Sequence, residues 1–372
     1  MTGVERTAPA ARGGRPTAAR GGRPTTDRGG RPAAAFPIGL IALDLDGTLI
    51  GEDLVLGPRT RAAIAAARAR GVAVSIVTGR MTTSALPYAR ELGLVDPIVA
   101  YQGALVRALP PPAADPRLGR ILAHRPLAAD AARDVIAWAK SVGLEPHVNH
   151  LERFVIQADD PRAEDYSSFL GARAEVVEDL RAWLTHPISK VISVAAASDP
   201  IPESVLAEGR QRFAGRAAVT ISHPRFLEFL APGVSKLVGV RHLARRARVP
   251  LGRVLAIGDQ FNDLEMIAGV GHGAAMSTAP AAVRAAARYI APAVSEEGVA
   301  QLIEQFVLVT PEVAARNAER LAAAHDGSSG GGRAGARGSG GDGDASDAAN
   351  DEGDGQSGPF ERVPASIGAS HA

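Results

Sequence analysis

Four acidic residues stand directly after two short apolar segments that lie far apart in the sequence. Asp44 and Asp46 occur in Asp-Leu-Asp-Gly-Thr, after the first segment. Asp259 and Asp263 occur in Gly-Asp-Gln-Phe-Asn-Asp, after the second. Short runs rich in Leu, Ile and Val are typical of buried parallel strands, and ligands bind α/β sheets beyond the carboxyl ends of such strands. We therefore expect the four carboxylates at one edge of a sheet.

Carboxylates gathered in this way repel one another strongly unless a cation lies among them. The chain has no cysteine, and no histidine cluster lies near the motifs, so oxygen ligands favour Mg²⁺ over zinc. A calcium-binding EF-hand loop shares the Asp-x-Asp spacing, but it follows a helix and needs a glutamate where this chain has Val55. For the second motif, the alternative is an ordinary helix start, since Asp and Asn are common caps.

Two further residues have types that suit a phosphate group. Thr78 ends a second β-branched segment, and its alternative role is a simple cap. Lys236 opens a segment of helical character after Ser235, and its alternative role is that of a solvated surface lysine. A cation at a helix N-terminus opposes the helix dipole, so a nearby anion would explain its position. Together, the four acids, the threonine hydroxyl and the lysine ammonium fit metal-assisted phosphoryl transfer.

The elements that must position these residues alternate between strand and helix. We expect strands at residues 40–43, 72–77, 98–101, 254–257 and 273–276. We expect helices at residues 58–70, 84–92, 235–247 and 262–268, the first with Pro58 in its first turn and Gly71 just past its end. This alternation predicts an α/β fold with a Rossmann-like parallel sheet covered by helices on both faces.

The middle of the chain predicts a smaller α/β domain inserted into the parallel-sheet core. We expect a helix at residues 130–142 and strands at residues 153–157, 189–195 and 219–222. The inserted cap domain is therefore placed at residues 120–222. The core is placed at residues 36–119 and 223–310.

Residues 1–35 and 326–372 have compositions that do not build a hydrophobic core, and both are expected to be disordered. In the first, Arg-Gly-Gly-Arg-Pro occurs three times with an eight-residue period from Arg12, and seven arginines against two acidic residues leave a net charge of +5. The second is rich in Gly, Ser, Ala and Asp and reads as an acidic tail.

The composition of the whole chain excludes several classes of protein. Its 372 residues are 46% hydrophobic with a formal net charge of +1, which does not indicate a dedicated nucleic-acid or membrane-surface binder. The lack of cysteine excludes disulfides and thiolate metal sites. No apolar run approaches the roughly 18 residues of a membrane helix, and no apolar segment follows the N-terminal arginines as in a secretory signal. We expect a cytoplasmic protein with no membrane partner.

Taken in order, the motifs resemble those of the haloacid dehalogenase superfamily. The matching positions are residues 44–48, Thr78-Gly-Arg80, Lys236 and residues 258–263. The insertion between Thr78 and Lys236 resembles the α/β cap of the Cof-type proteins, subfamily IIB. Residues 273–276 and 297–300 also resemble the Cof-type C-terminal pattern, so the resemblance spans roughly residues 38–305.

The resemblance implies a mechanism for phosphate ester hydrolysis. Asp44 would attack phosphorus and form an aspartyl-phosphate. Asp46 would protonate the leaving oxygen and then deprotonate the hydrolytic water. Thr78 and Lys236 would hold the phosphoryl oxygens, with Asn262 also at the phosphate site. The substrate would be a small phosphorylated metabolite, such as a sugar phosphate, a phosphorylated cofactor or a nucleotide.

The resemblance also implies the metal ligands. Mg²⁺ would be bound by Asp44, the backbone carbonyl of Asp46, and Asp259, and Asp263 would support these ligands. Departures from the family pattern lie near the entrance, where Gln102-Gly103 replaces the usual Asn-Gly and residues 277–279 replace Gly-Asn-Ala. Candidates for the substrate rim are Gly79, Arg80, Gln102, Gly103, Gln260 and Phe261, and in the cap His147, Asn149 and Arg153.

Two alternatives to a phosphatase follow from the same residues. A phosphomutase on this scaffold would keep the phosphoryl group on a product instead of releasing it to water. An RNA-associated protein would use the Arg-Gly-Gly repeats, but no aromatic residue precedes Phe36 to stack on bases. Non-specific, salt-dependent contact with polyanions is all that these arginines support.

Overall fold

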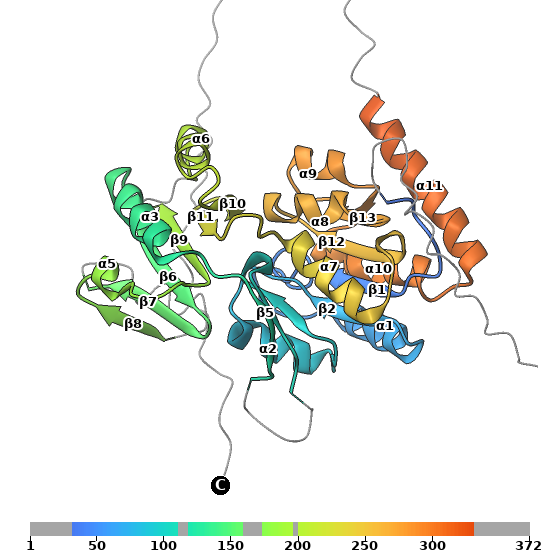
Figure 1. Cartoon of the computed structure of the whole chain (residues 1–372). Helices are drawn as coiled ribbons and strands as arrows, with labels where there is room; N and C mark the ends of the chain where they lie inside the picture. Colours follow the sequence, from blue (N-terminus) through green and yellow to red (C-terminus); the bar gives the residue numbers. More distant parts are fainter. Residues whose placement is uncertain (1–31, 111–117, 159–172, 196–199, 331–372) are drawn as a thin grey trace, which may run out of the picture. The chain divides into compact units, whose positions relative to one another are not determined.

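The computed structural model describes residues 32–110, 118–158, 173–195 and 200–330. Within these ranges the chain forms three sheets and the helices around them (Figure 1). The three Arg-Gly-Gly segments and residues 331–372 of the predicted acidic tail lie outside the described residues. None of the helices in the described ranges combines the length and the apolar character that a bilayer-spanning segment needs.

Five parallel strands form the central sheet, in the order β14–β13–β12–β1–β2. They are β1 (Leu40–Leu43), β2 (Ala73–Ile76), β12 (Val254–Gly258), β13 (His272–Met276) and β14 (Tyr289–Ala291). Leu43 at the end of β1 pairs with Ile76 of β2 and with Ile257 of β12. The residues that follow these three strands therefore lie beside one another at one edge of the sheet. The predicted parallel α/β core is confirmed.

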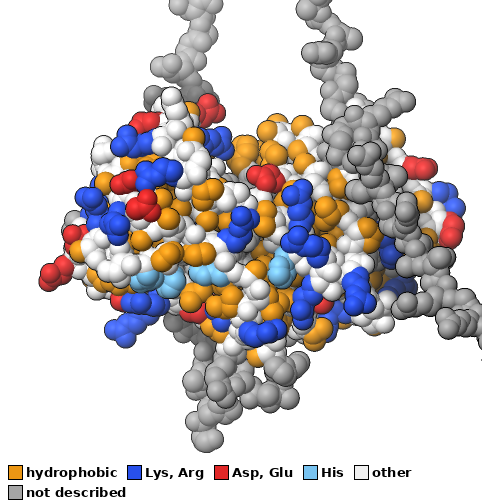
Figure 2. All heavy atoms as spheres, viewed as in Figure 1, with side chains coloured by type: hydrophobic (Ala, Val, Ile, Leu, Met, Phe, Trp, Pro, Cys, Tyr) orange, Lys and Arg blue, Asp and Glu red, His pale blue; other side chains and the backbone are white. Residues whose placement is uncertain are grey.

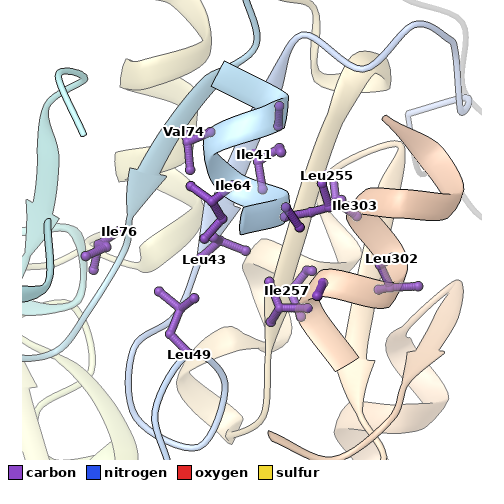
Figure 3. Packing of buried hydrophobic residues seen from close by; sticks show 14 of the residues in the cluster. Ile41, Leu43, Leu49, Ile64, Val74, Ile76, Leu255, Ile257, Leu302 and Ile303 are labelled. Carbon is purple, nitrogen blue, oxygen red and sulfur yellow. The ribbon is translucent and has the colours of Figure 1, made fainter. Parts of the chain in front are cut away.

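The two faces of the sheet bury different helices because successive strand residues point to opposite sides. Ile41 of β1 packs in one cluster with Ile64 and Ile303 (Figure 3), whereas Leu40 packs in a second cluster with Val240. Helices that contribute to the first cluster are α1 (Pro58–Ala69), α2 (Thr82–Glu91), α10 (Gly298–Phe306) and α11 (Pro311–Gly330). Those of the second are α7 (Lys236–Ala247) and α8 (Leu264–Ala268). Burial on both faces explains why the strands are almost wholly apolar.

The strand expected at residues 98–101 is present but belongs to a different sheet. β3 (Ile98–Ala100), β4 (Leu105–Arg107) and β5 (Ile121–His124) form a separate antiparallel sheet. A single parallel bridge between Val77 and Val99 links β3 to the end of β2. The chain reverses directly after β3 through the 3₁₀ turn η1 (Tyr101–Gly103), so β4 returns beside it. The predicted cap limit at residue 120 therefore falls before a strand that pairs with β4.

A six-stranded sheet and its helices form the cap. Its order is β10–β11–β9–β6–β7–β8, with only the β7–β8 pair parallel. The strands are β6 (Leu144–His150), β7 (Arg153–Gln157), β8 (Ala174–Val177), β9 (Lys190–Ala195), β10 (Ala218–His223) and β11 (Phe226–Leu230). Among the described residues of the cap, the helices are α3 (Ala129–Ser141), α5 (Leu180–Trp183) and α6 (Glu203–Arg212). β11 continues this sheet beyond the predicted limit at residue 222, because it forms a hairpin with β10.

The two faces of the cap sheet have different neighbours. One face, with Val191 and Phe229, packs against α3 around Trp138. The other, with Ile192 and Leu230, packs against core residues that include Met81, Tyr101 and Leu105. On the view in Figure 2, acidic and basic side chains are interspersed over α3 and α6, consistent with the ion pairs of Arg216 with acids of α3.

Short elements connect the C-terminal half, and both ends of the core differ from expectation. These elements are η2 (Leu251–Arg253), η3 (Phe261–Asp263), α9 (Ala281–Ala286) and η4 (Val294–Glu296).

The core continues past residue 310, because α11 buries Ala314 and Ala318 and extends five residues into the predicted tail. At the other end, Ala35 of the predicted leader donates from its N–H to the Gly252 carbonyl and accepts a hydrogen bond from His272.

Candidate active site

Three of the four predicted acids form a buried cluster. Asp44, Asp259 and Asp263 each offer a carboxylate oxygen, and these oxygens all lie within 4.8 Å of one another. The first two follow the neighbouring strands β1 and β12, and the Asp44 N–H donates to the Ile257 carbonyl at 3.0 Å. Asp263 is fixed from η3, because its Oδ2 accepts from the backbone N–H groups of Asp259 and Gln260, each at 3.1 Å.

Lys236 supplies a cation to this cluster. It is the first residue of α7 and is fully buried. Its Nζ lies 2.6 Å from Asp44 Oδ1 and donates to Asp263 Oδ1 at 2.7 Å. Burial by itself lowers the pKa of an ammonium group, but the carboxylates of Asp263 and Asp44 raise the pKa of Lys236 above its ordinary value. A lysine at a helix N-terminus is expected to have an anion nearby, and these two carboxylates are such anions.

The cluster has an excess of negative charge that fits a divalent cation. Burial, and then the neighbouring Asp263, raises the pKa of Asp44 well above its ordinary value and that of Asp259 to about 7. With all three carboxylates ionised, the single ammonium would leave two negative charges without compensation. Buried oxygen ligands with this charge suit Mg²⁺, which prefers carboxylates. The three carboxylates therefore fit the predicted Mg²⁺, with Asp44 and Asp259 as its ligands and Asp263 in support of them.

Gly47 and Thr48 shape the first loop in ways that the sequence motif did not reveal by itself. Gly47 has a φ of +76°, and a Cβ there would lie 2.3 Å from Asp259 Oδ2. Only glycine lets the loop approach this carboxylate. The buried Thr48 hydroxyl donates to Asp259 Oδ1 at 3.0 Å and so orients a predicted metal ligand. Thr48 had no assigned role, although its place in the motif was the available signal.

Asp46, the fourth acid, has its carboxylate outside the buried cluster. Its side chain is 49% exposed and is paired with Arg80, whose Nε donates to Asp46 Oδ2 at 2.8 Å and whose Nη2 contacts Oδ1. Although burial lowers the pKa of the guanidinium, Asp46 raises the pKa of Arg80 above its ordinary value. The sequence predicted a metal contact only through the Asp46 backbone carbonyl, and in this structure Arg80 holds the carboxylate.

Thr78 lies at the third of the adjacent strand ends. It is fully buried, its Oγ1 accepts from the Arg80 N–H at 3.1 Å, and its carbonyl accepts from the Gln102 N–H at 3.0 Å. The following Gly79 leaves no room for a Cβ, which would lie 2.3 Å from Gln102 Nε2. Thr78 therefore lies two residues past β2, in a tightly packed loop at the edge of the sheet where the acids lie, and its phosphate contact stays a prediction.

Gln102 and Gly103, predicted near the entrance, are packed inside. Gln102 is 1% exposed and has a φ of +58°. Its Oε1 accepts from Asn262 Nδ2 at 3.0 Å, so the amide of Asn262 is directed toward Gln102. Gly103 has a φ of +100°, and a Cβ there would lie 2.1 Å from the Ser235 carbonyl. The close approach of η1 to the start of α7 requires this glycine.

Of the three cap residues proposed as substrate contacts, His147 and Arg153 have structural partners. His147 and Asn149 are almost fully buried in β6, and the His147 ring packs edge-on against Phe154 at a centroid distance of 5.4 Å. Arg153 pairs with the exposed Glu175 and lies over the Trp183 ring. Phe261 of η3, in contrast, is 44% exposed and precedes Asp263 by two residues.

Comparisons with known proteins decide the family. The pattern of the haloacid dehalogenase-like hydrolases matches residues 41–303, more than half of the chain. The chain belongs to this family. The resemblance to Cof-type haloacid dehalogenase proteins is thereby confirmed.

Similar haloacid dehalogenase-like proteins are found among both curated sequences and solved structures. A 5-amino-6-(5-phospho-D-ribitylamino)uracil phosphatase of Bacillus subtilis is 29% identical, over 72% of this chain and 97% of that protein. An HMP-PP phosphatase of Serratia proteamaculans is 30% identical, over 64% and 84% of the two chains. The crystal structure of a haloacid dehalogenase-like hydrolase from Bacteroides thetaiotaomicron is 27% identical, with a TM-score of 0.61 over 72% of this chain and 99% of that one.

Proposed function

We propose that this hydrolase is a magnesium-dependent phosphatase that acts on a small phosphorylated metabolite through an aspartyl-phosphate on Asp44. The observation that carries the proposal is the buried Asp44 carboxylate, which shares Lys236 with Asp263 and lies beside Asp259. The names of the two curated relatives support the class, since one acts on a phosphoribitylaminouracil and the other on HMP-PP. A phosphorylated cofactor or sugar phosphate is the substrate class that we propose.

In the first step, a carboxylate oxygen of Asp44 forms a bond to phosphorus while the ester P–O bond breaks. Lys236 holds Asp44 in place and, with Thr78, balances charge on the phosphoryl oxygens. Asp46 gives its proton to the leaving oxygen. Because both oxygens of Asp46 contact Arg80 in this structure, the carboxylate must separate from the guanidinium before it can act on the leaving oxygen.

In the second step, Asp46 takes a proton from water as the water oxygen bonds to phosphorus. The bond between phosphorus and Asp44 breaks, which releases inorganic phosphate and restores the carboxylate. When bound, Mg²⁺ would neutralise the acids and polarise the phosphoryl group. Asp44, the Asp46 carbonyl and Asp259 are the proposed ligands, and Asp263 orients Lys236 and the backbone of the second loop.

Purified protein should hydrolyse p-nitrophenyl phosphate only with a divalent ion. We expect EDTA to lower the rate at least about 100-fold, since the metal stabilises charge in the transition state by several kcal/mol. Added Mg²⁺ should restore the rate. Phosphate release from a panel of phosphometabolites, measured with Mg²⁺, would then identify the substrate. Full activity after exhaustive chelation would contradict the proposed metal dependence.

Binding of Mg²⁺ should stabilise the fold more at high pH than at low pH. In the folded, metal-free chain, burial and Asp263 raise the pKa of Asp259 from 3.8 to about 7. The folded state therefore holds a proton that the unfolded state has already lost, and this group lowers the free energy of unfolding as pH rises from about 4 through 7. Mg²⁺ binds the ionised form and removes this loss.

Urea unfolding at pH 5.5 and pH 8, each with Mg²⁺ and with EDTA, measures this effect. The increase in the free energy of unfolding on adding Mg²⁺ should be larger at pH 8. An equal or larger increase at pH 5.5 would show that proton release from these carboxylates is not coupled to metal binding.

A further inference from the structure

A buried ion pair in the cap lies outside the residues that any sequence motif singled out. Lys190 begins β9 and Glu228 lies in the middle of the neighbouring β11. Their side chains are 4% and 2% exposed, and Lys190 Nζ lies 2.8 Å from Glu228 Oε2. Glu228 pairs in register with Ile192, which follows Lys190 by two residues in β9. The side chains of Lys190 and Glu228 therefore lie on the sheet face that packs against the core.

Lys190 reaches the loop that follows β2. Its Nζ donates to the Gly79 carbonyl at 2.8 Å, between Thr78 and Arg80. The same ammonium lies 5.9 Å from the centroid of the Tyr101 ring. One cap side chain therefore contacts the segment whose threonine is proposed to hold phosphate and whose arginine holds Asp46.

Glu228 is connected to the loop after β12 through the side-chain amides of Gln102 and Asn262. Its Oε1 accepts from Gln102 Nε2 at 3.2 Å, and it also accepts from the Ser222 hydroxyl. Gln102 in turn accepts from Asn262, the residue before Asp263. The ion pair is thus connected by hydrogen bonds to the loops after β2, β3 and β12.

The backbone at η1 needs such support. Tyr101 and Gln102 both have positive φ angles, +50° and +58°, directly before Gly103 at +100°. A left-handed conformation is unfavourable for a residue other than glycine, and it persists only where the surroundings hold it. The hydrogen bonds from Gln102 to Glu228 and from Asn262 to Gln102 fix the side chain of Gln102.

We propose that Lys190 and Glu228 are positioning residues, which hold the loops at Thr78–Arg80 and Tyr101–Gly103 in the geometry that phosphoryl transfer requires. This inference rests on the proposed phosphatase function. Both charged groups already have protein partners, so they orient the site rather than bind the substrate. A buried ion pair adds little stability compared with apolar side chains of similar size, so its effect is expected in loop geometry.

The test replaces both charges at once, with Lys190→Met and Glu228→Leu in the same full-length chain. Because neither charge is left unpaired, the melting temperature should stay close to that of the wild type. With p-nitrophenyl phosphate, kcat should fall about 10- to 100-fold, as for other residues that orient a site through a partner, while KM changes less than about threefold. Hydrogen exchange of the Arg80, Tyr101 and Gln102 amides should speed up, since their acceptors lie within these loops.

The matched control is Arg216→Met with Asp134→Leu, which removes an exposed ion pair from the same cap. It should leave kcat and the exchange of these amides unchanged. Wild-type exchange together with wild-type kcat in the Lys190/Glu228 variant would overturn the inference. So would a higher KM at unchanged kcat, because the pair would then bind substrate. A wild-type protein without phosphatase activity would reject the proposed function, while the exchange measurement would still test the loop positioning.

Discussion

Asp44→Asn should lose hydrolysis of p-nitrophenyl phosphate by a factor on the order of 10⁴ or more, because an amide cannot act as the attacking oxyanion. The fold should remain, since asparagine has the same shape and removes a charge that burial already disfavours. Burial and Asp263 raise the pKa of Asp44 well above its ordinary value, so loss of this carboxylate relieves repulsion in the metal-free cluster. The melting temperature in EDTA should therefore stay equal or rise.

The matched control is Asp53→Asn, the same change at an exposed position of the same loop, where the side chain accepts a hydrogen bond from the Val55 N–H. Its rate should equal that of the wild type. Acid-quenched wild-type enzyme should carry a hydroxylamine-sensitive phosphoryl group that Asp44→Asn lacks. Turnover by Asp44→Asn within tenfold of the wild type, with deamidation excluded by mass spectrometry, would remove Asp44 from the role of nucleophile.

Lys236→Met should reduce both catalysis and stability. Loss of one charged donor at the phosphoryl group typically costs about 10²- to 10³-fold in kcat. Removal of one partner from a buried charged network costs about 3–5 kcal/mol of the free energy of unfolding. Lys236 is fully buried between Asp44 and Asp263, so this full penalty applies. Urea unfolding in EDTA measures the loss.

The stability loss of Lys236→Met should depend on pH. Without the ammonium, the folded carboxylates hold their protons to higher pH than in the wild type, whereas the unfolded ones lose them near pH 4. The free energy of unfolding of the variant should therefore fall as pH rises from 5 to 8, and Mg²⁺ should restore part of it. Lys140→Met, at the exposed end of α3, is the control and should change neither rate nor stability. A variant that unfolds like the wild type at pH 8 in EDTA would show that Lys236 does not compensate the cluster.

The sequence by itself determined the core strands and the edge at which the acids meet. Asp44 and Asp259 follow wholly apolar strands, and parallel strands place their carboxyl ends together whatever the intervening chain does. The sequence also determined the helix from Pro58 to its end before Gly71, because proline and glycine mark these positions through backbone conformation alone. These signals are local or depend on one rule of sheet topology.

Only the tertiary structure decided which polar side chains touch. Gln102 was expected near the entrance, but the left-handed backbone at η1 turns it inward to Glu228 and Asn262. β11 was missed, although its hairpin partner β10 covers the strand expected at residues 219–222. Lys190 and Glu228 are single charged residues within apolar strands, which could indicate that they are buried. However, a charged residue in a strand usually faces water. Their burial against one another, 38 residues apart, depends on strand register, which no local pattern specifies.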